Sequence, residues 1–83
     1  MKILYFAWLR ERLDRDSDEI DVPAEVSTVA ELIDFLAARD EVFAAATERR
    51  TLIRAAVDEE LVDHDTPIAG ARTVALFPPM TGG

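Results

Sequence analysis

The chain has 83 residues and a formal net charge of −8, from nine basic and seventeen acidic side chains. A chain of this length forms one domain with a small core, so it has little room for an enclosed active site. The acidic balance disfavours nucleic acid and membrane surfaces as ligands. The absence of cysteine excludes a disulfide framework and a thiolate nucleophile, and a single histidine disfavours a metal site.

The apolar run over residues 2–8 predicts a strand covered on both faces and therefore central in its sheet. The run is too short to span a bilayer and lacks the flanks of a signal peptide, so we expect a cytoplasmic protein. Residues 9–13 predict a short helical turn. Ile20 and Val22 then alternate with polar neighbours in a short second strand, which Pro23 ends or confines to an edge.

Two features invite a metal-site interpretation that the spacing does not favour. Six acidic side chains lie close together: Asp14, Asp16, Asp18, Glu19, Asp21 and Glu25. Their spacing lacks the ligand and glycine pattern of a calcium loop, so we interpret them as a solvated loop and edge strand. His64 has no second nitrogen or sulfur ligand and is interpreted as a loop residue. We therefore predict no metal site.

The middle of the chain predicts two helices. Thr28 and Glu31 have the spacing of a capping box, so a helix should begin after Thr28. Its apolar residues recur at helical spacing and form one stripe, which predicts that this main helix packs across one face of a sheet: Val29, Leu32, Ile33 and Leu36. Asp40 is expected to cap a second, shorter helix with Val42, Phe43 and Ala46.

The C-terminal part predicts strands separated by turns. Residues 52–57 form a third strand, and the acidic run 58–60 fits a hairpin turn before Leu61 and Val62. Thr66, Pro67 and Gly70 mark a loop. Residues 73–77 form the last strand, which ends at two prolines because proline cannot donate to a sheet ladder.

These elements predict an α+β fold. The first and last strands are the most apolar, so they are expected to lie side by side in the middle of a mixed sheet, with the main helix across one face. That arrangement is the ubiquitin-like β-grasp. We therefore divide the chain into a β-grasp domain over residues 1–77 and a flexible C-terminal arm over residues 78–83.

The arm ends in Gly82 and Gly83, after two prolines that favour an extended backbone. Six extended residues reach at most roughly 20 Å, which is enough to enter another protein's active site. Glycine passes through a narrow channel because it has no side chain. The terminal carboxylate is a poor electrophile until it is activated, so another protein must supply the activation. The arm predicts a carrier whose working group is its own C-terminus.

The residues at both ends of the chain resemble a known family. Residues 74–83, Val-Ala-Leu-Phe-Pro-Pro-Met-Thr-Gly-Gly, resemble the signature of the small subunit of molybdopterin synthase. The opening residues 3–11 and the segment Ala-Ala-Val-Asp at 55–58 also resemble that family. The resemblance thus covers essentially the whole chain. Met80 stands where valine is usual, and Ala71 and Arg72 stand where acidic residues are usual.

The resemblance implies a sulfur carrier for molybdenum cofactor biosynthesis. An activating enzyme would use ATP, a nucleotide that this chain does not itself bind tightly, to adenylate Gly83, and a sulfur donor would form the thiocarboxylate. The arm would then enter the large synthase subunit, in a heterotetramer of two small and two large subunits, and donate sulfur to cyclic pyranopterin monophosphate. The catalytic side chains would lie in the large subunit, so this chain is a non-catalytic cosubstrate with no bound cofactor.

Seven residues are predicted to position the arm or to contact the partner. Thr81 and Gly82 give the arm clearance, and an apolar collar with one polar neighbour forms the interface: Phe77, Pro78, Pro79, Met80 and Arg10. Phe6 and Trp8 extend this surface or lie buried. Strand alternation places Phe77 on the face opposite Val74 and Leu76, and an ordinary core role for Phe77 is the alternative.

Three other functions fit the terminal diglycine. A carrier of the thiamine type also ends in Gly-Gly, although the Phe77-Pro78-Pro79 stretch argues against it. A ubiquitin-like modifier would use the same adenylation and then form isopeptide bonds to lysines. A plain interaction module would bind its partner without using the arm. Deletion of Gly83 separates the module, which keeps its binding, from the others, which lose activity.

Overall fold

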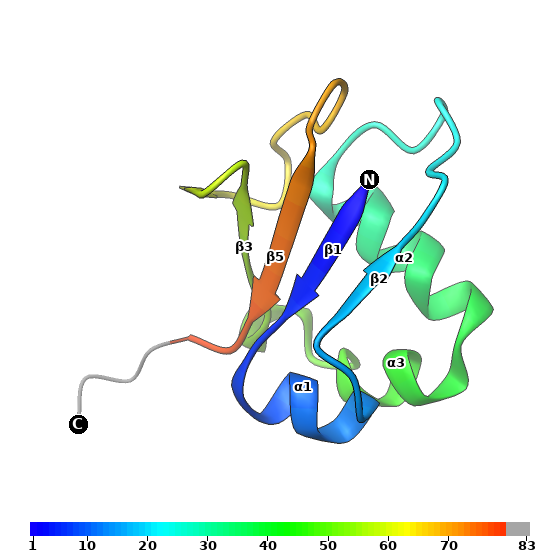
Figure 1. Ribbon diagram of the computed structural model, residues 1–83, viewed down its shortest axis with the longest axis vertical. Helices are drawn as coiled ribbons and strands as arrows, with labels where there is room; N and C mark the ends of the chain where they lie inside the picture. Colours follow the sequence, from blue (N-terminus) through cyan, green and yellow to red (C-terminus); the bar gives the residue numbers. More distant parts are fainter. Residues whose placement is uncertain (80–83) are drawn as a thin grey trace.

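The computed structural model describes residues 1–79, so the predictions for Met80, Thr81, Gly82 and Gly83 lie outside it. The helices and strands are, in chain order, β1 Lys2–Tyr5, α1 Ala7–Leu13, β2 Ser17–Glu19, α2 Val29–Arg39, α3 Glu41–Ala46, the 3₁₀ turn η1 Arg50–Leu52, β3 Arg54–Val57, β4 Glu60–Val62 and β5 Thr73–Phe77. The strands form one sheet in the order β2-β1-β5-β3-β4 (Figure 1).

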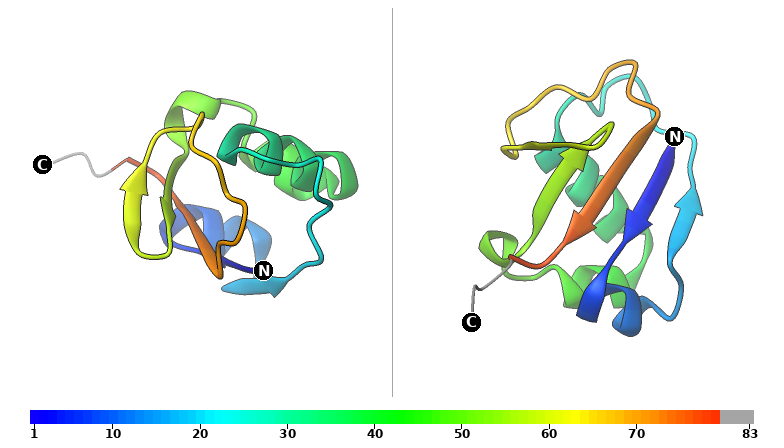
Figure 2. Two further views of the ribbon diagram at one scale, coloured as in Figure 1. Left: turned by 90° about the horizontal axis from the view of Figure 1, so that it is seen from above. Right: turned by 60° about the vertical axis from the view of Figure 1, so that its left-hand side comes forward.

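The two terminal strands lie side by side at the centre of this sheet. β1 pairs with β5 in parallel, with Ile3 opposite Val74 and Tyr5 opposite Leu76. The other pairings are antiparallel, and the helices lie on one side of the sheet (Figure 2). The predicted α+β β-grasp, with its first and last strands central and one main helix across one face, is thereby confirmed.

The core lies between this sheet and α2. Every residue of the predicted stripe of α2 is buried, and so are the inward-facing residues of the central strands, Ile3, Tyr5, Val74 and Leu76. Fully burying one such aliphatic side chain contributes about 1.5–3 kcal/mol. The alternation of buried and partly exposed residues along β5 leaves Ala75 and Phe77 on the opposite face.

Local capping fixes the two helix starts as the sequence predicts. The Thr28 hydroxyl accepts a hydrogen bond from the Glu31 N–H at 3.2 Å, and the Glu31 carboxylate accepts one from the Thr28 N–H at 3.2 Å. Asp40 accepts hydrogen bonds from the N–H groups of Val42 and Phe43 at 2.9 and 3.2 Å. Both predicted N-caps are confirmed.

The first strand is shorter than predicted and is covered on one face only. It ends at Tyr5, because Ala7 adopts a left-handed φ of 55° and begins α1. Apolar content alone does not reveal this change from strand to helix, since residues 6–8 are as apolar as the strand itself. Leu4 is half-buried rather than buried, because the helices pack on the face to which Ile3 and Tyr5 point.

The second strand lies at Ser17–Glu19, before the predicted Ile20 and Val22. The Met1 carbonyl accepts a hydrogen bond from the Ile20 N–H at 2.9 Å, and the Met1 amine donates to the Ile20 carbonyl at 3.0 Å. These two bonds join Ile20 to the residue before β1, and the pairing of the two segments ends there. Ile20 is buried as the chain leaves the sheet.

The third strand also begins later than predicted, because Leu52 belongs to η1. A two-residue hairpin turn connects β3 to β4, and its type was not predictable from the acidic run. Asp58 and Glu59 have φ values of 48° and 72°, the positive values of a type I′ turn. Within residues 1–79 no helix is long and apolar enough to cross a membrane.

Candidate functional site: the open sheet face at the arm

β5 ends at Phe77, directly before the arm, and among residues 1–79 one face of the sheet beside this end carries no helix. In the view of Figure 1 this open face points toward the reader, with the helices behind and below the strands. Strand pairing sets Leu4, Ala75 and Ala56 side by side across β1, β5 and β3. Leu61 of β4 lies opposite Ala56 and extends the row to the sheet edge.

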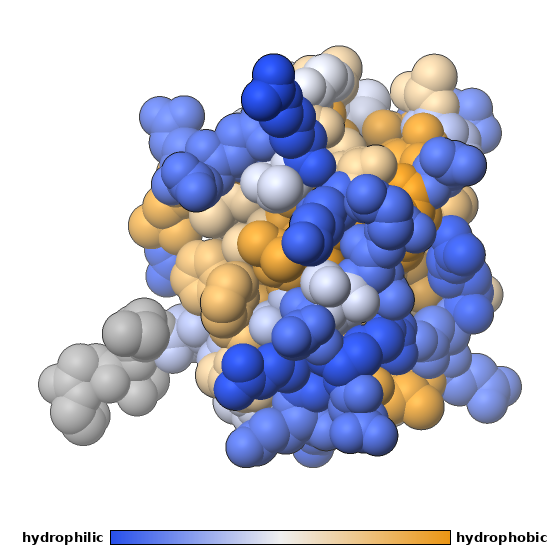
Figure 3. Space-filling view, in the orientation of Figure 1, coloured by the Kyte–Doolittle hydropathy of each residue, from blue (hydrophilic) through white to orange (hydrophobic). Residues whose placement is uncertain are grey.

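The row continues toward the arm through two aromatic residues. Phe77 is half-buried and lies opposite Arg54 in β3. Phe6, which follows β1, is 45% exposed and donates its N–H to the Leu76 carbonyl at 3.2 Å. We call this surface the arm face; it consists of Leu4, Phe6, Ala56, Leu61, Ala75 and Phe77. Figure 3 shows apolar side chains gathered over β1, β5 and β3 next to the start of the arm.

The predicted interface residues lie at this face in part. Phe77, Pro78 and Pro79 are half-buried at the base of the arm, and Phe77 is not among the buried core residues, so the alternative core role does not describe it. Arg10 is exposed on α1, and its backbone N–H donates to the Phe6 carbonyl at 3.4 Å, whereas its side chain lines a shallow hollow with Glu11 and Asp14. Trp8 is half-buried and lines a groove between α1 and the segment after α3 instead.

Leu61 is an exposed residue of the arm face that the sequence interpretation did not single out. It is 59% exposed, the largest value among the exposed large hydrophobic residues. The signal was available in the hairpin. Once Asp58 and Glu59 are assigned to a two-residue turn, the register places Leu61 on the same face as Ala56 and Ala75, which in turn share a face with Phe77.

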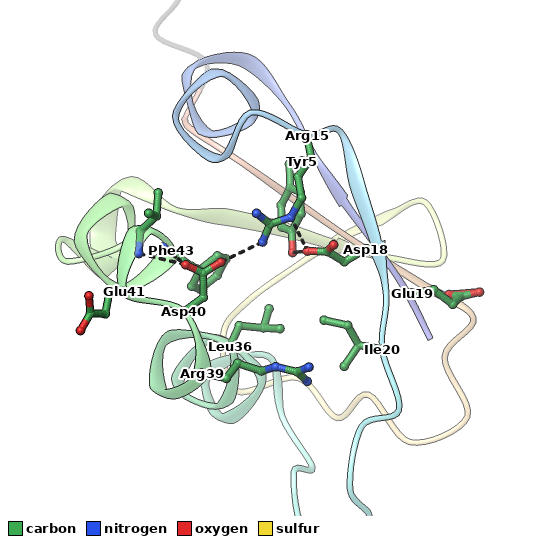
Figure 4. A pocket seen from close by; sticks show the side chains of 11 residues that line it. Tyr5, Arg15, Asp18, Glu19, Ile20, Leu36, Arg39, Asp40, Glu41 and Phe43 are labelled. Atoms are coloured by element: carbon green, nitrogen blue, oxygen red, sulfur yellow. Dashed lines mark hydrogen bonds and ion pairs between the residues drawn. The ribbon is translucent and has the colours of Figure 1, made fainter.

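A second groove, with a volume of about 600 Å³, lies at the far side of the domain between β2 and the helices. Its walls are held by an ion-pair network in which Arg15 reaches Asp18 at 2.7 Å and Asp40 at 2.9 Å (Figure 4). The Tyr5 hydroxyl donates to Asp18 at 2.8 Å. Burial and this hydrogen bond to a carboxylate raise the pKa of Tyr5, so its hydroxyl stays protonated.

Every polar group of this network is satisfied by a partner within the domain. The Asp18 hydrogen bond raises the pKa of the Arg15 guanidinium, and the Arg15 hydrogen bond lowers the pKa of Asp40. The charged side chains of Arg15, Asp18 and Asp40 thus connect β2 to the start of α3. Because Arg15 pairs with both Asp18 and Asp40, we assign the network a structural role.

Neither metal-site feature forms a metal site among the described residues. Within residues 1–79, no group of three or more His, Asp or Glu side chains comes together to hold an ion. The imidazole of His64 lies with its Nε2 at 2.7 Å from the Ile53 carbonyl and joins the loop after β4 to the start of β3. Its role in the described fold is a hydrogen bond between segments.

Comparison with known proteins defines the family. Residues 3–83 match the ThiS family. The chain belongs to the ThiS family. The Molybdopterin synthase sulfur carrier subunit of Escherichia coli (strain K12) is 41% identical over 83 residues, which cover 100% of this chain and 99% of that protein. The protein of the same name from Haemophilus influenzae is 28% identical, with the same coverage.

Solved structures of other proteins share the fold of this ThiS family chain. SAMP1 from Haloferax volcanii superposes with a TM-score of 0.73 at 24% identity and covers 99% of this chain and 97% of its own. The HVO 2177 protein of Haloferax volcanii has a TM-score of 0.71 at 21% identity, with 99% of this chain and 84% of its own covered. The predicted family and the predicted function as a molybdopterin synthase sulfur carrier subunit are confirmed by the relatives.

Proposed function

We propose that the chain carries sulfur as a thiocarboxylate on Gly83 and delivers it inside a large synthase subunit docked on the arm face. Membership of the ThiS family and the 41% identity to the Escherichia coli sulfur carrier subunit support this proposal. The single structural observation behind it is the continuous apolar arm face, which ends where the arm begins.

The proposed cycle of sulfur loading and transfer has three steps, each of which another protein catalyses. ATP converts the Gly83 carboxylate to an acyl adenylate and releases pyrophosphate. A sulfur donor then displaces AMP and leaves the thiocarboxylate. In the synthase, the sulfur passes to cyclic pyranopterin monophosphate, and water cleaves the acyl C–S bond and supplies the oxygen that returns Gly83 to a carboxylate. The chain itself supplies the carried group and the docking surface, and we propose the cytoplasm, where ATP is available, as its place of action.

The arm face has the composition of an interface centre. Aromatic and aliphatic side chains dominate it, and Arg54, opposite Phe77, lies at its border. Such a surface binds through a few desolvated anchors surrounded by polar contacts. We propose a heterotetramer of two large and two small subunits, in which Phe77 with Pro78 and Pro79 anchors each small subunit at the mouth of the partner's channel.

The chemical step is tested by intact mass. Incubation with the cognate activating enzyme, ATP and a sulfur source should raise the mass by about 16 Da, because one terminal oxygen is replaced by sulfur. The variant lacking Gly83 should show no such change. A wild-type mass that stays constant with a demonstrably active donor contradicts the carrier function, and a new conjugate on lysines of other proteins supports the modifier function instead.

The docking step is tested by paired substitutions. Phe77→Asp and Leu61→Asp should each weaken binding to the large subunit at least about tenfold in calorimetry, because each places a charge in a desolvated contact. Val42→Asp is the matched control, since Val42 is 54% exposed but lies on α3 at the far groove. Equal affinity of all three variants and wild type would refute the arm face as the docking surface.

A further inference from the structure

The basic side chains of this acidic protein are concentrated around the exit of the arm. Two segments flank that exit: residues 7–13, which contain α1, and residues 48–54, which contain η1. Together they carry five arginines and two glutamates, a net charge of +3, whereas the rest of the chain carries four basic and fifteen acidic side chains, a net charge of −11. The domain is therefore strongly bipolar.

The fold brings these two segments to the same end of the sheet. Phe6 precedes α1 and is hydrogen-bonded to β5, and Arg54, which follows η1, lies opposite Phe77. Both segments thus approach β5 where the arm starts. In Figure 1, α1 and the turn before β3 lie at the lower end of the sheet, next to the last described residues of the arm.

A groove of about 360 Å³ separates the two segments on the helix side of the arm. Trp8 and Leu52, with Ala45 and Ala46 of α3, supply its apolar surface, and Leu52 is 39% exposed. Arg12 and Arg49 line it as well, with the Arg12 guanidinium 5.6 Å from the centre of the Trp8 ring. We call this surface the arm groove. The guanidinium groups of Arg12 and Arg49 thus lie next to apolar side chains, and Glu48 is the acidic residue in the lining.

The charges of the arm groove are not neutralised within the described domain. Among residues 1–79, the ion pairs of arginine involve Arg15 with Asp18 and Asp40, and Arg50 with Asp34. Arg12 and Arg49 form none within that range, and both are exposed. A protein with a net charge of −8 that keeps two free guanidinium groups beside a groove presents a local site for carboxylates.

We propose that the arm groove binds an acidic segment with an apolar anchor, located at the rim of the large-subunit channel that receives the arm. Carboxylates of that segment pair with Arg12 and Arg49, and its apolar side chain packs on Trp8 and Leu52. The inference rests on the proposed docking of the arm. Because the remaining surface is acidic, the bipolar charge turns the arm end toward such a rim before contact and so raises the association rate.

Stopped-flow association with the purified large subunit tests this inference. The double variant Arg12→Glu/Arg49→Glu should associate about tenfold more slowly than wild type at low salt, and the difference should shrink at ~0.5 M salt, where charges are screened within several ångström. Arg12→Lys/Arg49→Lys should keep most of the wild-type rate because it keeps the charge. Trp8→Ala should instead raise the dissociation rate.

The matched control is Arg39→Glu/Arg72→Glu, which makes the same change in net charge away from the arm. Arg39 packs over Phe35 in α2, and Arg72 precedes β5 at the opposite end of that strand. Thermal melts verify that each variant is folded. Equal slowing by both charge-reversal pairs, or faster association of the groove pair, overturns the arm groove as an acid-binding site. If wild type itself fails to bind, the proposed function fails, and this inference fails with it.

Discussion

At the level of single residues, Asp40 combines two stabilising roles. It caps α3 through the N–H groups of Val42 and Phe43, and it pairs with Arg15 at 2.9 Å. The cap is predictable from sequence because its partners are two and three residues away. The ion pair is not, since Arg15 lies 25 residues earlier and meets Asp40 only after β2 and α3 have been placed by the fold.

Substitution of Asp40 should separate the two roles. Asp40→Ala removes cap and charge and should lower the free energy of unfolding by about 1–2 kcal/mol in urea titration at pH 7. Asp40→Asn keeps a capping oxygen, so its loss should be smaller and should report the ion pair alone. An Asp40→Asn protein as unstable as Asp40→Ala would show that the cap contributes little.

Asp40 also makes the stability of the domain depend on pH. The Arg15 hydrogen bond, with the two backbone N–H groups, lowers the pKa of Asp40 in the folded state, so the unfolded chain binds the proton more readily. The stabilisation is therefore present above the unfolded pKa of about 3.9 and is lost as pH falls through the lowered value. Urea midpoints between pH 7 and pH 2 should fall less steeply for Asp40→Asn than for wild type; parallel curves would contradict this assignment.

At the level of elements, the ends of β1 and β2 could not be predicted from the apolar pattern of the sequence. The sequence correctly identifies β1, β3, β4, β5, α2 and α3, because their apolar periodicity and caps are local. It predicts the second strand at Ile20 and Val22, whereas β2 lies at Ser17–Glu19. It extends β1 to residue 8 because Phe6 and Trp8 are as apolar as the strand. The break comes from Ala7, whose positive φ is unusual for a residue other than glycine and carries no sequence signal.

The β3–β4 turn offers a test of backbone strain. Glu59 has a φ of 72° in a two-residue turn, where glycine is favoured. Glu59→Gly should raise the free energy of unfolding by about 0.5–1 kcal/mol, because relief of strain outweighs the added freedom of the unfolded chain. Glu60→Gly in β4 is the control and should destabilise. A lower urea midpoint for Glu59→Gly would contradict a strained turn.

At the level of the whole molecule, topology and function were both predictable, whereas the docking surfaces were predictable only in part. The two most apolar strands lie at the chain ends, so their central pairing follows from burial. Phe77 was predicted as an interface residue from its place in the apolar collar at the base of the arm. Leu61 and the arm groove depend on contacts between distant segments: the β4 register, and the approach of Leu52 to Trp8 across α1 and η1.

The number of residues in the arm should affect the rate of sulfur transfer. In the proposed complex the arm face holds the domain against its partner, so the distance from Phe77 to the carried group is set by the number of residues between them. One glycine added after Gly83 moves that group by up to about 3.5 Å. Misplacement by even ~1 Å can cost about 100-fold in rate, so sulfur transfer should fall at least that far.

Binding and transfer should respond differently to this extension. The arm face is unchanged, so affinity for the large subunit in calorimetry should stay within about twofold of wild type. Transfer is measured in a single turnover with protein whose thiocarboxylate has been verified by mass, so that failed loading is not mistaken for failed transfer. Wild-type transfer by the extended chain would show that the terminus is not held in register, and that docking at Phe77 does not set the position of the reacting group.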